Sequence, residues 1–119
     1  MNFNNFTIKS QEALQKAQEI ASEHGHQAIE CGHVLKGILT VDDNVVPYIL
    51  KKLGVNLNIF RSALDKIVES YPKVSGTAQQ YLSESANQAM QKASSYLKEF
   101  KDEFVSIEHI LLGLLSVKD

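Results

Sequence analysis

The stretch "ALQKA" at Ala13–Ala17 returns as "AMQKA" at Ala89–Ala93, 76 positions later. When residues 7–39 are placed on residues 83–115 without a gap, nine of the 33 pairs are identical. Unrelated sequences would share about two, and self-similarity at a fixed offset indicates a repeated supersecondary unit. The residues of the first unit that recur identically in the second are Ala13, Gln15, Lys16, Ala17, Glu23, His33, Leu35, Gly37 and Leu39. Any fold of this chain must therefore accommodate the same unit twice.

Apolar residues recur at helical spacing along the whole chain, which predicts an all-α fold. Thr7 is the expected N-cap of a first helix that ends near Gly25. A second helix covers about 34–39, a third runs from about 42–44 to 54, and a fourth runs from 56 to 71. After a loop at 72–80, a fifth helix is capped by Ser83 or Ser85, and a sixth follows Ser106. No alternating pattern predicts a strand.

The recurring alanines are small residues on the buried stripe of a helix, where they let a partner helix pack closely. The repeated stretch is thus interpreted as a packing seam rather than as a motif with chemistry. Each half is expected to bury its apolar face against the other, which gives a pseudo-twofold bundle. The chain is read as a single domain, 1–119, with repeat one at 6–71, a linker at 72–80 and repeat two at 81–119.

The two units differ in length. The first has four predicted helices, whereas the second has only two before Asp119. We therefore expect the natural protein to continue with about two more helices, so that the domain is truncated here. In that case the fifth and sixth helices should present an exposed apolar face.

Charge and hydropathy exclude several kinds of partner. The net charge of −2 and the pI of about 6.1 give no electrostatic footprint for a phosphate backbone, so no nucleic acid is expected. No apolar run reaches the roughly 18 residues of a membrane helix, and there is no secretory leader pattern. The single cysteine, Cys31, agrees with a reducing compartment. A cytoplasmic protein without a membrane partner is predicted.

The histidines raise the question of a metal. His24, His26 and His33 lie close in sequence, but Cys31 and His33 form only a bare C-x-H with no second pair, so no metal site is expected. His33 and His109 occupy equivalent repeat positions, which favours a shared structural role. Residues at i and i+2 of a helix point to different sides, so Cys31 and His33 form no obvious catalytic pair. No catalytic residues are predicted, and the chain by itself is not expected to be an enzyme.

Polar residues at helix starts are the better candidates for a site. In a two-fold arrangement the starts of equivalent helices can approach one another, which would gather Thr7, Ser83, Asp102 and Glu108 at one end of the bundle. Glu108 sits in a first helical turn, where a carboxylate suits the positive end of the helix dipole. Ordinary capping explains the sequence Ser106 to Glu108 equally well.

The two units resemble the Clp repeats of the Clp/Hsp100 N-terminal domain family. The resemblance spans residues 6–117 and rests on "FTIKSQEALQKAQEIASEHGHQAIECGHVLKGIL" and "YLSESANQAMQKASSYLKEFKDEFVSIEHILLGLL". The stretches "YPKVSG" and "KDEFVSIEH" are similar to the ClpB, or disaggregase, branch. The chain departs from the family at Gly32, where the first unit commonly has Glu, so that helix start should be less polar.

The resemblance implies a domain of eight helices, about six of them present here, at the N-terminus of an AAA+ chaperone. Such a domain captures unfolded or aggregated polypeptides for a ring hexamer that uses ATP and Mg²⁺ beyond this fragment and works with a DnaK-type chaperone system. The fragment itself is expected to be monomeric and to hold no cofactor. The substrate-binding residues that the resemblance implies are Thr7, Asp102 and Glu108, beside an apolar groove supplied by Tyr96, Leu97 and Ile110.

Two alternatives stay open at this point. A ClpA- or ClpC-type N-domain would dock adaptor proteins for a Clp protease. A free-standing helical adaptor would have no ATPase at all.

Overall fold

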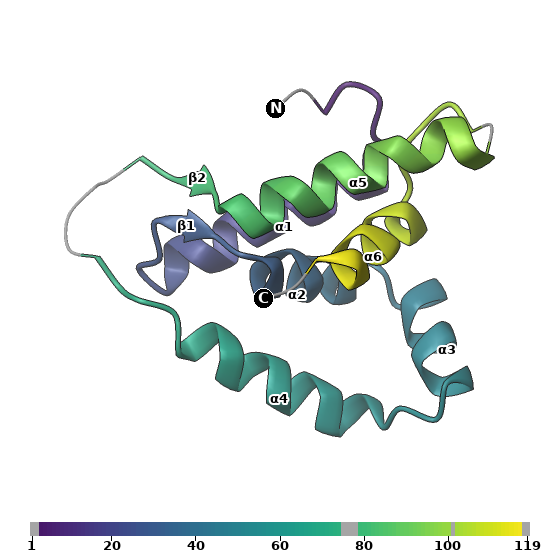
Figure 1. The fold of residues 1–119 in the computed structure, drawn as a ribbon. Helices are drawn as coiled ribbons and strands as arrows, with labels where there is room; N and C mark the ends of the chain where they lie inside the picture. The colour runs from purple at the N-terminus through teal and green to yellow at the C-terminus, as the bar shows by residue number, and fades with distance from the viewer. Residues whose placement is uncertain (1–2, 75–78, 101, 118–119) are drawn as a thin grey trace.

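The computed structural model describes residues 3–74, 79–100 and 102–117 (Figure 1). Helices dominate the described residues, so the all-α prediction is confirmed. Their order is α1 (Ile8–Glu23), β1 (Ala28–Ile29), α2 (Cys31–Val41), α3 (Val45–Lys52), α4 (Leu57–Glu69), β2 (Tyr81–Leu82), α5 (Glu84–Phe100) and α6 (Ile107–Ser116). Part of the predicted linker, residues 75–78, lies outside the described residues.

The predicted helix ends are confirmed by their caps. The Thr7 side chain accepts a hydrogen bond from the Ser10 amide at the start of α1, and Asn56 does the same for Ile59 in α4. Gly25 follows α1 with φ of 72°, the left-handed conformation that commonly ends a helix. Of the two candidates for α5, the structure selects Ser83, whose hydroxyl accepts from Ala86 at 3.1 Å.

The repeated stretch is the packing seam that the sequence predicts. α1 packs mainly on α2, and α5 mainly on α6. A methyl group added at Gly37 of α2 would overlap the carbonyl oxygen of Ala13 and approach the Ala17 nitrogen at 3.1 Å. Gly113 stands in the same relation to Ala89 and Ala93. Each helix pair is therefore in backbone contact at a glycine.

Two short parallel pairings join the repeats, and no sequence pattern predicted them. β1 pairs with β2, and Phe6 forms an isolated parallel bridge with Val105. The Thr7 amide donates to the Val105 carbonyl at 2.9 Å, and the Ser83 amide donates to the Ile29 carbonyl at 3.0 Å. These two bonds are related by the offset of 76. The segment that enters each repeat thus pairs with the segment before the second helix of the other repeat.

The core lies where the two helix pairs meet. The buried side chains include Phe6, Ile38, Met90, Val105 and Ile110. α3 and α4 lie outside the two helix pairs, with α4 below them in the view of Figure 1, and they add Val46, Leu50, Leu64 and Val68 to the buried core. No helix within the described ranges is long and apolar enough to cross a membrane.

The glycine contacts give a direct test. Alanine is favoured over glycine inside a helix by about 1 kcal/mol, but here its methyl group would meet backbone that cannot yield. Gly37→Ala and Gly113→Ala should each lower the free energy of unfolding by about 1 to 3 kcal/mol in urea titration, since overpacking outweighs propensity. Thr40→Ala, on the exposed face of α2, is the control and should change it by no more than about 0.5 kcal/mol. A stabilised glycine variant would contradict the packing account.

Candidate functional site at the start of α6

The starts of α2 and α6 are built in the same way. The Glu30 amide donates to His33 Nδ1 at 2.9 Å, and the Ser106 amide donates to His109 Nδ1 at 2.9 Å. In each case the histidine is the third residue of the helix and forms a capping box with the N-cap residue, Glu30 or Ser106. The shared structural role that the repeat predicts for His33 and His109 is confirmed.

The two histidines differ in what their other nitrogen meets. His109 Nε2 lies 2.9 Å from Asp102 Oδ2, whereas His33 Nε2 lies 2.8 Å from His26 Nδ1. Asp102 and His26 are themselves equivalent positions, 76 residues apart. Because Nδ1 of each cap histidine accepts from a backbone amide, the neutral ring carries its proton on Nε2 and donates it. One repeat therefore ends this chain of bonds in a carboxylate, and the other ends it in a second imidazole.

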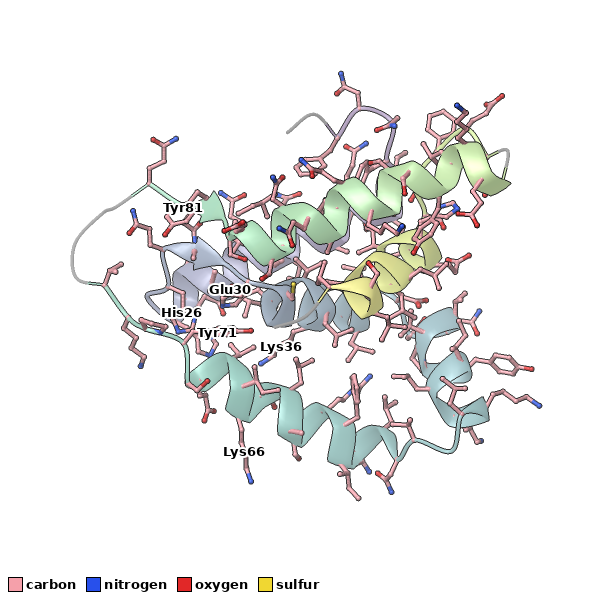
Figure 2. The ribbon with its side chains drawn as sticks, viewed as in Figure 1. His26, Glu30, Lys36, Lys66, Tyr71 and Tyr81 are labelled. Atoms are coloured by element: carbon pink, nitrogen blue, oxygen red, sulfur yellow. The ribbon has the colours of Figure 1, made fainter. Side chains whose placement is uncertain are left out.

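Gly32 and Glu108 are a second point of divergence. The Gly32 amide donates to the Tyr71 hydroxyl at 3.2 Å, and a side chain at position 32 would collide with that hydroxyl. Tyr71, which follows α4, thus covers the start of α2 (Figure 2). Glu108, at the equivalent place on α6, is exposed. Gly32 stands where the family commonly has Glu, and here Tyr71 covers that helix start. The start of α6, by contrast, is open.

A cavity of about 500 Å³ lies at this open start, and we call it the acidic pocket. It combines carboxylates with apolar side chains, since Phe104 is 52% exposed and Leu112 41%. Its lining residues are Asp102, Glu103, Phe104, Ser106, Glu108, His109 and Leu112. Sequence reasoning found Asp102 and Glu108 but missed Phe104 and Leu112. The repeat alignment carried a signal for Leu112, which replaces the half-buried Lys36 of the first unit.

Thr7 lies next to the segment that leads into this pocket. Besides capping α1, it donates its side-chain proton to the Ser10 hydroxyl at 2.8 Å, and its amide bonds Val105. Its counterpart Ser83 bonds Ile29 instead, on the β1 and β2 side of the molecule (Figure 1). The expectation that Ser83 shares one end with Thr7, Asp102 and Glu108 is therefore wrong, because the two-fold relation places equivalent caps at opposite ends.

The residues expected to form an apolar groove beside Thr7, Asp102 and Glu108 are buried or half-buried. Ile110 has no exposed surface, so the expectation that it lines an open groove does not fit the structure. Tyr96 and Leu97 are half-buried on α5, and Lys92 Nζ lies 5.5 Å from the centre of the Tyr96 ring. None of the three lines the acidic pocket.

A second depression, which we call the apolar groove, lies between α2, α3, α4 and α6. Its volume is about 290 Å³, and it contains no charged side chain among its lining residues. Leu115 of α6 is 74% exposed there. The exposed apolar face that the repeat argument expects of the fifth and sixth helices is therefore seen on α6, whereas no large apolar side chain is exposed on the described part of α5. The lining residues are Cys31, Gly32, Leu35, Ile49, Leu50, Leu53, Phe60, Leu64, Ile67, Tyr71, Leu111, Leu114 and Leu115.

Metal chemistry has no support in the described part of the chain. No group of three or more His, Cys, Asp or Glu side chains in residues 3–74, 79–100 and 102–117 could hold a metal ion. The Asp102 carboxylate is already engaged by His109, and the His26–His33 pair is closed on itself. The pocket can offer exposed carboxylates and apolar side chains, which suits non-covalent binding.

The fold belongs to a known family of domains. Residues 5–119 match the family described as the Clp repeat (R) N-terminal domain, and the chain belongs to that family. Over 118 residues it is 54% identical to the chaperone protein ClpB of Bacteroides thetaiotaomicron and 43% identical to that of Porphyromonas gingivalis. Each match covers 99% of this chain but only 14% of the relative. The chain therefore corresponds to the N-terminal domain of ClpB-type chaperones.

Solved structures agree on the fold. The N-terminal domain of Hsp104 from Candida albicans superposes with a TM-score of 0.86 at 21% identity, over 95% of this chain and 75% of that one. The N-terminal domain of ClpD from Arabidopsis thaliana gives a TM-score of 0.76 at 23% identity, over 100% and 80%.

Asp102 and Glu108 should differ in how much each contributes to the free energy of unfolding. Asp102→Ala removes the partner of His109 Nε2 and should lower the free energy of unfolding by about 1 kcal/mol, the usual net value of one hydrogen bond. Glu108→Ala removes an exposed side chain and should change it by about 0.5 kcal/mol or less. Urea titration of both variants measures the difference. Equal losses would show that Asp102 does not support the cap of α6.

Proposed function

We propose that this domain captures unfolded or aggregated polypeptides for a ClpB-type AAA+ chaperone. The observation that carries the proposal is the acidic pocket, in which Phe104 and Leu112 are exposed beside Asp102 and Glu108. Exposed apolar groups rimmed by polar ones are typical of a surface that binds another protein. The similarity to ClpB proteins indicates the kind of chaperone in which the surface works.

The chemistry of the pocket suits a partner without fixed structure. Apolar contacts bury the side chains of an unfolded segment without reading their order, and carboxylates add attraction for nearby Lys or Arg side chains. Neither kind of contact requires a preformed surface on the partner. A binder of this kind accepts many sequences, each weakly.

The remaining roles belong to a longer protein. We propose that it is a homohexameric ATPase that binds ATP and Mg²⁺ in AAA+ domains, threads the captured chain, and works with a DnaK-type chaperone in the cytoplasm. Support comes from the ClpB relatives, of which this chain matches 14%. The domain's part is to hold substrate, not to hydrolyse nucleotide.

A charge-matched pair of variants tests the proposed capture. Glu108→Ala should weaken binding of a permanently unfolded protein, such as reduced and carboxymethylated α-lactalbumin, about tenfold in fluorescence anisotropy. Glu84→Ala is the control, because Glu84 is also an exposed glutamate in a first helical turn but lies at the start of α5. It should leave binding unchanged. Equal effects of the two substitutions would contradict a site at the start of α6.

Thr7 allows capping and binding to be told apart. Thr7→Ala should cost about 1 kcal/mol of stability through the lost cap and also weaken capture, whereas Thr7→Ser keeps the capping hydroxyl. Thr7→Ser should therefore keep the free energy of unfolding at its wild-type value. If Thr7→Ala lowers stability without any change in capture, Thr7 is a cap and nothing more.

A further inference from the structure

The first repeat contains a buried pair of imidazoles that the proposed function does not use. His26 is 3% exposed, His33 has no exposed surface, and their rings meet through the hydrogen bond between His26 Nδ1 and His33 Nε2. Tyr71 packs on both, with its ring centre 5.7 Å from that of His26 and 5.0 Å from that of His33. The two imidazole rings therefore form the surface against which the Tyr71 ring packs.

The hydrogen bonds fix where each proton lies. His33 Nδ1 accepts from the Glu30 amide, so the His33 proton is on Nε2 and is donated to His26 Nδ1. His26 must then carry its own proton on Nε2. That nitrogen is buried and makes no hydrogen bond of ordinary geometry. The pair holds two protons, and a third must break either the bond between the rings or the cap at Glu30.

The charged surroundings disfavour that third proton. Burial is the main cause that lowers the pKa of His33, to about 4, and the groups that lower it further are His26, His24 and Lys36. Burial, and then His24 and Lys73, also lower the pKa of His26. Glu30 and the backbone carbonyl of Tyr71 act in the opposite direction on His26. These groups come from the end of α1, from α2 and from the segment after α4.

The consequence for stability has a definite sign. An unfolded histidine has a pKa near 6.5, so between pH 6.5 and about 4 the unfolded chain binds more protons than the folded one. The contribution of the neutral pair is complete above pH 6.5 and is lost as the pH falls through this range. The contact that the pair supports is the one with the Tyr71 ring.

That contact borders the apolar groove. Tyr71 and Gly32 both line the groove, and the bond from the Gly32 amide to the Tyr71 hydroxyl joins the end of α4 to the start of α2. We propose that the His26–His33 pair is a pH-sensitive latch, in which uptake of one proton breaks the pair, frees Tyr71 from the start of α2 and opens that end of the apolar groove. The second repeat has a carboxylate in place of the second imidazole and lacks this device.

Nuclear magnetic resonance of the 119-residue chain between pH 7.5 and 4 tests the latch. The Gly32 amide and the Tyr71 ring resonances should shift together with the His26 ring, at a midpoint below 6.5. The Ile59 amide, which the uncharged Asn56 side chain caps at the start of α4, should stay in place and serves as the internal control. If His26 titrates while Gly32 and Tyr71 do not move, or if Ile59 moves in step with them, the proposal is overturned.

A variant strengthens the test. His26→Asn keeps an acceptor for His33 Nε2 but cannot take up a proton, so the Gly32 shift should move at least one pH unit lower. In the wild type, binding of the dye 8-anilinonaphthalene-1-sulfonate should rise several-fold once the pH falls below the midpoint of the Gly32 shift, while the amide spectrum stays dispersed, and in His26→Asn it should not rise at that pH. An equal rise in both proteins would show that acid opens the groove without the pair. The wild-type titration decides the question even if the variant does not fold.

Discussion

The backbones of α1 and α2 touch where Gly37 lies on the carbonyl of Ala13, and α5 and α6 meet in the same way at Gly113. No side chain separates the helices at these points, so the position of the second helix is set by the backbone of the first. Helices this close leave little room to slide, because packed interiors resist even small displacements. The cap histidines near the starts of α2 and α6 are placed by these two contacts, and the pocket is placed with them.

Much of this arrangement could be predicted from the sequence because it depends on local chemistry repeated at a fixed offset. Thr7, Asn56 and Ser83 are read as caps from residue type and position, and the alanines are read as a seam from their spacing. Asp102 and Glu108 were placed together correctly. The predictions for Ser83 and Ile110 were wrong because both depend on distant partners. The position of Ser83 is set by its bond to Ile29 of the other repeat, and the burial of Ile110 is set by packing between helices rather than by its own helical face.

Two features left no readable signal. The strands are two residues long, too short for alternation to show, and their partners lie in the other repeat. The contact of Tyr71 with Gly32 joins residues far apart in sequence, although the glycine itself marked the position as unusual. Together these features explain how one duplicated unit yields two unlike ends. The first repeat closes its helix start with aromatic rings, and the second keeps carboxylates exposed to solvent.

The crossed pairing also bears on how such a chain is made. The segment at Phe6 leaves the ribosome before its partner at Val105, which is 99 residues further along the chain. Contacts between distant segments slow folding, since the chain must close a long loop before the pairing stabilises it. The first repeat can form its helices early, yet its entry segment stays unpaired until synthesis of the second is almost finished. The two repeats therefore complete each other only after both have been synthesised, and a chain that stalls between them leaves Phe6 and Ile29 without their pairing partners.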